Sequence, residues 1–107
     1  MSVNIECSGR VLTAYLQGEI DHHSAADLRN TIDTAITENA PETLVLDFKD
    51  ITFMDSSGIG LVMGRYRVLS GTGAQIHVTN MSPQIYKVMK LAGMERLVFL
   101  DKTTVKA

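Results

Sequence analysis

The sequence contains one cysteine, no tryptophan and only 6% aromatic residues. The single cysteine, Cys7, can form no internal disulfide, and no cysteine cluster is available for zinc. With few aromatic residues, a net charge of −2 and no basic block, a nucleic-acid-binding surface is not expected. No apolar run approaches the length that spans a membrane. These shortages leave an ordinary globular protein as the expected class.

The N-terminal residues have neither the basic start nor the apolar stretch of a secretory signal, so we expect a cytoplasmic protein. Cys7 has the same parity as Val3 and Ile5 along a predicted strand. That parity predicts a buried free thiol. At 107 residues, with 45% hydrophobic and 21% charged residues, the chain is expected to form one domain over residues 1–107.

Residues rich in strand formers are separated by short turn sequences. The predicted strands are 3–7, 11–16, 43–48, 74–78 and 97–100. Gly9 lies in the turn between the first two strands, which therefore form a hairpin. The run 43–48 is almost continuously apolar, which predicts a central strand covered on both faces. Lys49 and Asp50 are expected to turn the chain after it.

Three helices are expected between the later strands. The first begins at Ser24, which with Asp27 resembles a capping box, and ends near Asn39 because Pro41 cannot continue a helix. The second covers residues 58–69. Its apolar stripe is predicted to consist of Ile59, Val62, Met63, Tyr66 and Leu69.

The third helix is predicted to begin at Ser82, because an N-cap residue followed by Pro83 is a typical helix start. Gly93 suits its C-cap. Its apolar face is predicted to consist of Ile85, Val88, Met89 and Ala92.

The order of these elements predicts an α/β domain with a mixed sheet of about four to five strands and three to four helices. The N-terminal hairpin lies at one edge, and the other strands are largely parallel. Functional groups in such sheets gather at the carboxyl ends of the strands. The relevant ends are 18–23, 47–57 and 79–82.

The middle end contains Asp55, Ser56 and Ser57 at the point where a loop becomes a helix. All three residue types are favoured as N-caps. A helix N-terminus has free N–H groups and a positive dipole end, so it can be switched by a phosphate. The residue that caps the helix has its oxygen occupied, and chemistry alone does not choose between Ser56 and Ser57 for modification.

Three glycines follow the serines: Gly58, Gly60 and Gly64. Each costs the helix about 1 kcal/mol relative to alanine. Together they leave one side of the helix without bulk, which would let another backbone approach closely.

An enzyme with a nucleophilic serine is an alternative, with His22, His23 or His77 as base and Asp21 or Asp47 to orient it. The motif lacks the Gly-x-Ser-x-Gly elbow, and no spacing selects a triad. A P-loop is also not indicated, because Gly60 is not followed by the required lysine. We therefore expect no catalytic activity.

The segment Asp21-His22-His23 could suggest a metal site, but no third ligand is identifiable by spacing. A polar loop before a helix is the simpler interpretation. The carboxylates of Glu19 and Asp21 could then face an arginine of a partner. We expect His77 to be a hydrogen-bonded histidine of the sheet.

Three segments together resemble anti-sigma factor antagonists of the STAS family, sporulation type. They are Gly18-Glu19-Ile20-Asp21-His22-His23-Ser24-Ala25, Phe53-Met54-Asp55-Ser56-Ser57-Gly58-Ile59-Gly60 and Gly64-Arg65-Tyr66-Arg67. The resemblance extends from Val3 to about Leu100. Relatives commonly end in a further helix, for which only residues 101–107 remain.

The resemblance implies partner switching. The unphosphorylated protein binds an anti-sigma factor, itself a serine kinase, and a sporulation sigma factor is released. Phosphorylation of Ser56 separates the pair, and a serine phosphatase restores the active form. ATP belongs to the kinase, so no cofactor is expected, and we expect a monomer when free.

The docking surface implied by the resemblance lies around Asp21 and the serine motif. The residues expected to bind the partner are Glu19, Asp21, His22, Asp55, Ser57, Gly58, Ile59, Gly60, Met63 and Gly64. A STAS scaffold in another signalling assembly, such as a stress response or a transporter tail, is the alternative with the same fold. Phosphorylation is expected to change the fold little and partner affinity strongly.

Overall fold

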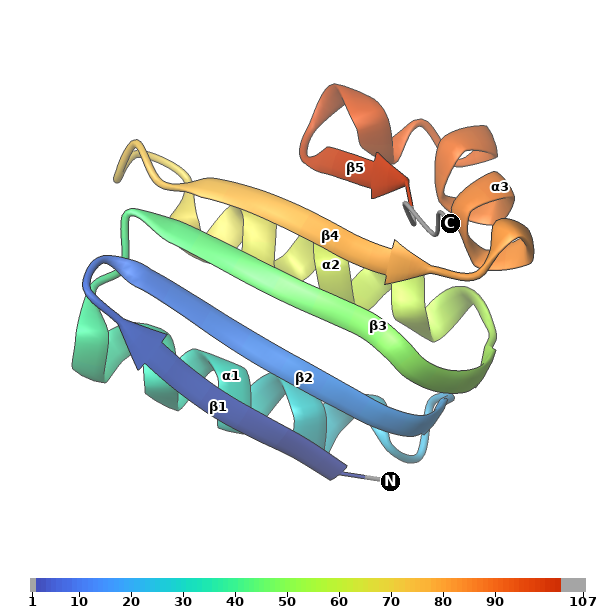
Figure 1. Ribbon diagram of the computed structural model, residues 1–107, viewed down its shortest axis with the longest axis horizontal. Coiled ribbons are helices and arrows are strands. Elements are labelled where there is room, and N and C mark those ends of the chain that lie inside the picture. Colours follow the sequence, from blue (N-terminus) through green and yellow to red (C-terminus); the bar gives the residue numbers. More distant parts are fainter. Residues whose placement is uncertain (1, 103–107) are drawn as a thin grey trace.

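The computed structural model describes residues 2–102 (Figure 1). Its elements are β1 (Ser2–Ser8), β2 (Val11–Ile20), α1 (Ala25–Asn39), β3 (Thr43–Met54), α2 (Ser56–Leu69), β4 (Gln75–Met81), α3 (Pro83–Leu91), the 3₁₀ helix η1 (Met94–Arg96) and β5 (Phe99–Lys102). The five strands form one sheet in the order β1-β2-β3-β4-β5. Within residues 2–102, no helix is long and apolar enough to cross a membrane.

The sheet is mixed, as the sequence predicts. β1 and β2 are antiparallel and pair from Ser2–Gln17 to Ser8–Val11, and Gly9 takes the left-handed conformation in their turn, with φ of 62°. Gly tolerates this φ without steric cost. β2, β3, β4 and β5 pair in parallel. The predicted hairpin at one edge is therefore confirmed.

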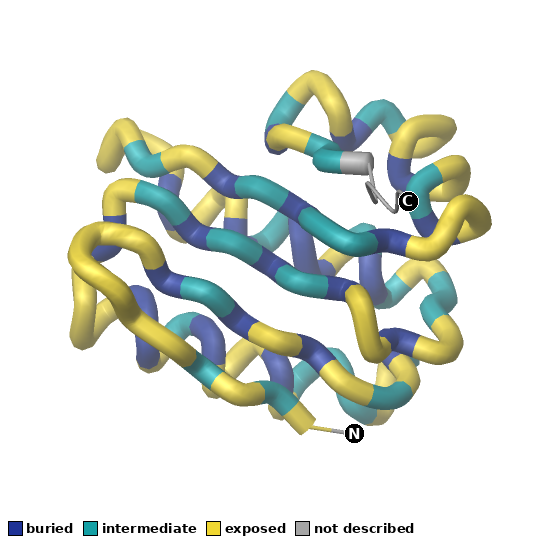
Figure 2. Tube along the Cα trace, in the orientation of Figure 1, coloured by how far each residue is buried: buried dark blue, intermediate teal, exposed yellow. Residues whose placement is uncertain are grey.

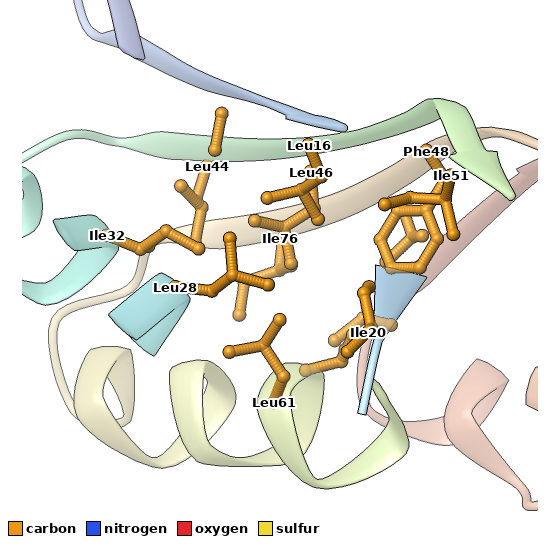
Figure 3. Close-up of a cluster of buried hydrophobic side chains, with 14 of the residues drawn as sticks. Leu16, Ile20, Leu28, Ile32, Leu44, Leu46, Phe48, Ile51, Leu61 and Ile76 are labelled. Carbon is orange, nitrogen blue, oxygen red and sulfur yellow. The ribbon is translucent and has the colours of Figure 1, made fainter. Parts of the chain in front are cut away.

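The core lies on one face of the sheet, where α1 and α2 pack (Figure 1). Buried and more exposed residues alternate along the strands (Figure 2). In β3, Leu44, Leu46 and Phe48 are buried against the helices. Figure 3 shows Leu28 of α1 and Leu61 of α2 reaching into the same cluster.

The prediction that residues 43–48 are covered on both faces is wrong, because Val45 and Asp47 are only half-buried. The reason is topological. β2, β3 and β4 lie side by side in chain order, and crossover connections are almost always right-handed. Successive helices of such a series fall on the same face of the sheet, which leaves the other face open.

The predicted turn at Lys49 and Asp50 is also wrong, since β3 continues through both residues to Met54. The pairing with β2 shifts register between Tyr15 and Gln17 and again between Gly18 and Glu19. These irregularities bend the strand pair without ending it.

The thiol of Cys7 is exposed, which corrects the prediction that it is buried. The prediction that Val3 and Ile5 lie on the core side of this strand is confirmed, because both are half-buried and pack against the core. Cys7 lies near the end of an edge strand, and the core covers it less well than it covers Val3 and Ile5.

α1 ends at Asn39 as predicted, and Ala40 follows with a left-handed φ of 42°. The predicted capping box is absent: Ser24 makes no side-chain cap. Its hydroxyl instead donates to the carbonyl of Glu19 at 2.9 Å and accepts from the N–H of Asp21 at 3.1 Å. Ser24 therefore stabilises the loop before α1.

The buried stripe of α2 differs from the prediction: Gly58, Leu61, Val62, Arg65 and Leu69 are buried. Tyr66 is exposed, while Ile59 and Met63 are half-buried. The apolar residues of this helix are spread around its circumference, so their spacing alone did not identify the face turned to the core.

In α3, the Ser82 hydroxyl accepts from the N–H of Ile85 at 3.2 Å, which confirms the predicted start. Ile85 and Met89 are buried, but Val88 is 44% exposed. Gly93 lies beyond the C-cap, Ala92, and precedes the short helix η1, which was not predicted. Residues 103–107 lie outside the described part of the chain. The further C-terminal helix that is common in relatives would fall largely on these residues.

One buried charge connects the two long helices. Arg65 of α2 is 3% exposed, and its Nε lies 2.8 Å from Oδ1 of Asp33 in α1. The direction of the N–H falls short of a hydrogen bond, and Nη1 also lacks a hydrogen-bond partner. Burial lowers the pKa of Arg65, an effect that the charge of Asp33 opposes. Asp33 is therefore the compensating charge for a desolvated guanidinium.

Removal of the negative charge of Asp33 should destabilise the protein. We expect Asp33→Asn to lower the free energy of unfolding by about 1–3 kcal/mol, since Asp33 is only partly buried. The double variant Asp33→Asn, Arg65→Met should recover most of this loss because no buried charge remains. Urea unfolding measures both, with Glu38→Gln, an exposed residue of α1, as a control expected within about 0.5 kcal/mol of wild type. Equal stability of Asp33→Asn and wild type would contradict the compensating role.

Candidate functional site

Parallel pairing of β2 and β3 joins two segments that are far apart in the sequence. Glu19 pairs with Phe53, and Ile20 pairs with Met54. Just beyond the strands, the N–H of Asp55 donates to the carbonyl of Ile20 at 3.1 Å. The loop before α1 and the N-terminus of α2 therefore meet at the carboxyl edge of the sheet, at the right of Figure 1.

Asp55 is the N-cap of α2. Its Oδ1 accepts from the N–H of Ser57 at 2.8 Å, and its carbonyl accepts from the N–H of Gly58 at 3.0 Å. Neither serine is needed as a cap. Ser56 is the first residue of the helix and exposed, whereas Ser57 is half-buried. The two serines therefore differ in accessibility, and Ser56 is the more exposed of the two.

Asp21 is held by its own loop. Its Oδ1 accepts from the N–H groups of His23 and Ser24, each at 2.9 Å. These hydrogen bonds, chiefly that from Ser24, lower the pKa of Asp21, so its carboxylate is charged at neutral pH. The stabilisation is present above the ordinary carboxyl pKa and is lost as the pH falls through the lowered value.

Ser24 was not among the predicted site residues, although it fixes Asp21 from both sides. The sequence does contain a pattern that could have identified Ser24: an Asp followed three residues later by a Ser. This spacing is typical of turns in which side chains hydrogen-bond to the local backbone. His22 and His23 are exposed, with ring centroids 4.0 Å apart. Glu19 is exposed at the end of β2.

The outer side of α2 forms a strip without bulk. Ser56, Gly60 and Gly64 recur at four-residue spacing, and Met63 lies three residues after Gly60, so the two are neighbours on the helix surface. Apart from its chain neighbours and the backbone of its own helix, a Cβ added at Gly60 or Gly64 would have no heavy atom within 4 Å. Here the glycines face open space, so internal packing does not require them.

Gly58 is different. It is buried, and an added Cβ would collide with the side chain of Met54. Its neighbour Ile59 is half-buried and packs against the core. Of the predicted partner-binding residues on α2, Gly58 is buried, Ile59 and Met63 are half-buried and pack against the core, and Gly60 and Gly64 line the outer side of the helix.

His77 and Asp47, which the sequence offered as possible members of a catalytic triad, form hydrogen bonds with other residues of the chain. His77 Nδ1 lies 3.0 Å from Asp101 Oδ2, and its ring stacks on Phe99 with centroids 4.6 Å apart. His77 is thus a hydrogen-bonded sheet histidine, as predicted. Asp47 accepts from the side-chain amide of Asn80 at 3.0 Å. Across residues 2–102, no cluster of three His, Cys, Asp or Glu side chains is placed to hold a metal ion.

Comparison with known proteins agrees with this architecture. Residues 2–107 match the STAS domain. The chain is 31% identical over 107 residues to the anti-sigma F factor antagonist of Paenibacillus polymyxa, covering 100% of this chain and 92% of that protein.

Two solved structures of SpoIIAA, each 36% identical to this chain, share the fold. The unphosphorylated form has a TM-score of 0.80, with 96% of this chain and 90% of that chain covered. The phosphorylated form, from Bacillus, has a TM-score of 0.73, with 96% and 93% covered. The family match, the relative and the sheet topology lead to one conclusion: this chain belongs to the STAS domain family.

Proposed function

We propose that this protein is a phosphorylation-controlled anti-sigma factor antagonist of the sporulation type. In its unphosphorylated form it binds an anti-sigma factor, which is also a serine kinase, and thereby releases a sporulation sigma factor. The observation that carries this proposal is an exposed Ser56 at the first position of α2, beside the Asp21 loop. Similarity to the Paenibacillus antagonist and to both forms of SpoIIAA supports it.

The docking surface consists of the Asp21 loop and the outer side of α2. The glycine strip allows a partner backbone or side chain to lie against the helix backbone, while Met63 offers an adaptable apolar contact beside it. Glu19, Asp21 and Asp55 give the surface negative charge. A basic residue of the anti-sigma factor is the matching feature.

A phosphate on Ser56 would act on this surface without unfolding the domain. It adds about −1.5 to −2 charges next to the Asp55 carboxylate, which already occupies the N-terminus of α2. In the free protein water solvates this charge. Inside an interface that already contains carboxylates, the phosphate would be desolvated and repelled, and the complex would dissociate.

The remaining parts of the switch belong to the partners. The kinase supplies ATP, and a serine phosphatase removes the phosphate, so this chain needs no cofactor of its own. Such a protein acts in the cytoplasm, where sigma factors meet RNA polymerase. The chain itself has a binding role and no enzymatic one.

Serine substitutions test the modified residue. We expect Ser56→Ala to bind the anti-sigma kinase but to accept no phosphate, and Ser56→Asp to lose binding because a carboxylate enters the interface. Ser57→Ala, the matched control, should still be phosphorylated. Mass spectrometry with site localisation after incubation with the kinase and ATP measures the first effect, and titration calorimetry the second. Normal phosphorylation of Ser56→Ala would refute the assignment.

Glycine substitutions test the strip. Gly60→Ala should raise the free energy of unfolding by about 0.5–1 kcal/mol, because alanine is the better helix former and nothing crowds its Cβ. The same change should weaken anti-sigma binding by about tenfold or more, since the added methyl group separates the two backbones.

Gly58→Ala is the contrasting variant, because the added Cβ displaces Met54 and should lower stability. Unfolding experiments and binding titrations on both proteins give the comparison. If Gly60→Ala bound with unchanged affinity, the strip would not be part of the docking surface.

Two substitutions at Asp21 separate its charge from its structural role. Asp21→Asn keeps an oxygen that can accept from His23 and Ser24 but removes the charge, so the fold should persist while affinity falls by about tenfold or more. Asp21→Ala removes the acceptor as well and should also loosen the loop, which amide exchange of residues 21–24 would detect. Glu95→Gln, an exposed change in η1, is the control. Unchanged affinity of Asp21→Asn would exclude a charge contact.

A further inference from the structure

β1 is an open edge of the sheet. It is seven residues long, pairs with β2 alone among residues 2–102, and does so without a register shift. Its sequence contains no proline and no lysine, and Glu6 is its only charged residue. Edge strands are normally protected by such residues, by bulges or by shortness. The opposite edge, β5, covers four of the described residues and pairs irregularly with β4.

We propose that β1 pairs with β1 of a second copy of this chain, forming a twofold-symmetric dimer with a continuous ten-stranded sheet. The strand is self-complementary when antiparallel strands are centred on Ile5. Val3 then lies opposite Cys7 of the second copy, and Asn4 lies opposite Glu6. Ser2 lies opposite Ser8.

This register matches both faces of the strand. On the helix side, the apolar pairs Val3–Cys7 and Ile5–Ile5 extend the core, and these residues are half-buried or exposed in the single chain. On the open side, each Glu6 meets an Asn4 amide and never a second carboxylate. Glu6 Oε1 accepts from the Tyr15 hydroxyl at 2.9 Å, which leaves Oε2 for that amide.

The helix layer also fits the dimer. α1 contacts both β1 and β2, so it lies below that strand pair. With strands about 4.8 Å apart, the two α1 helices of the dimer would lie about 10 Å from each other, a normal helix packing distance.

Two grooves border α1 on this side, of about 450 Å³ and 300 Å³. The first is lined by Ile5 and Ala35, the second by Val3 and Leu28, and Thr31 borders both. The α1 residues that line them include the uncharged Thr31 and Thr34 and, at the far end of each groove, the carboxylates of Asp27 and Glu38. Pairing of β1 with a second copy brings apolar side chains to the mouths of grooves that water otherwise fills.

Disulfide trapping tests the register. Val3→Cys places a thiol opposite the native Cys7 of the second copy, so mild oxidation should give a covalent dimer in at least about tenfold higher yield than in the wild type. In the wild type the two Cys7 residues would lie four positions apart along the strands, about 13 Å. Asn4→Cys is the matched control, because its side chain points to the other face and meets Glu6. Equal dimer yields from the two variants would overturn the register.

Sedimentation equilibrium of the unmodified protein tests the association itself. We expect a monomer–dimer equilibrium that Ile5→Lys shifts to monomer, because two lysines would meet at the symmetry axis. Circular dichroism shows whether that variant is folded. A wild-type protein that remains monomeric at all concentrations, in line with the monomer predicted from the sequence, would overturn the proposal. Kinase binding is not used in either test, so the outcome does not depend on the proposed function.

Discussion

Parallel pairing between β2 and β3 is the interaction on which the rest of this structure depends. It continues to the last residues of both strands, Ile20 and Met54, and one more hydrogen bond, from Asp55 to Ile20, extends it into the following turn. The same pairing places hydrophobic residues of the two central strands side by side below α1 and α2. The core and the proposed docking surface are therefore two consequences of one set of backbone hydrogen bonds.

The constraint that places both long helices on one face has an equally broad effect. It gives the protein a single core face and leaves the open face with polar and aromatic residues that pair among themselves, such as Tyr15 with Glu6 and His77 with Asp101. It also requires the buried Arg65 to find its counter-charge on α1, since the two helices are neighbours.

Much of the fold could be predicted from the sequence because its signals are local. Gly9 between two strand-like runs indicated the hairpin, and Ser82 with Pro83 marked the start of α3. The errors arose where tertiary context decides. Whether Val45 is covered depends on where two helices pack, and whether Cys7 is exposed depends on how far the core extends below an edge strand.

The site was predictable to a similar degree. Acidic and hydroxyl residues at two strand ends indicated its location, and topology brought those ends together. The identity of the N-cap could not be predicted, because three successive residues were all suitable and only the conformation of the turn selects Asp55. The different tasks of Gly58 and Gly60 were also hidden, since sequence does not reveal which side of a helix touches Met54.

The cap formed by Asp55 has a consequence for how long a modified state would last. Because a carboxylate of the chain already accepts from the N–H of Ser57, a phosphate on Ser56 would find that donor occupied. The chain would gain little free energy by keeping the group and would not shelter it from a phosphatase. The lifetime of the phosphorylated state would then be set by the abundance of the phosphatase. The domain itself would neither prolong nor limit it.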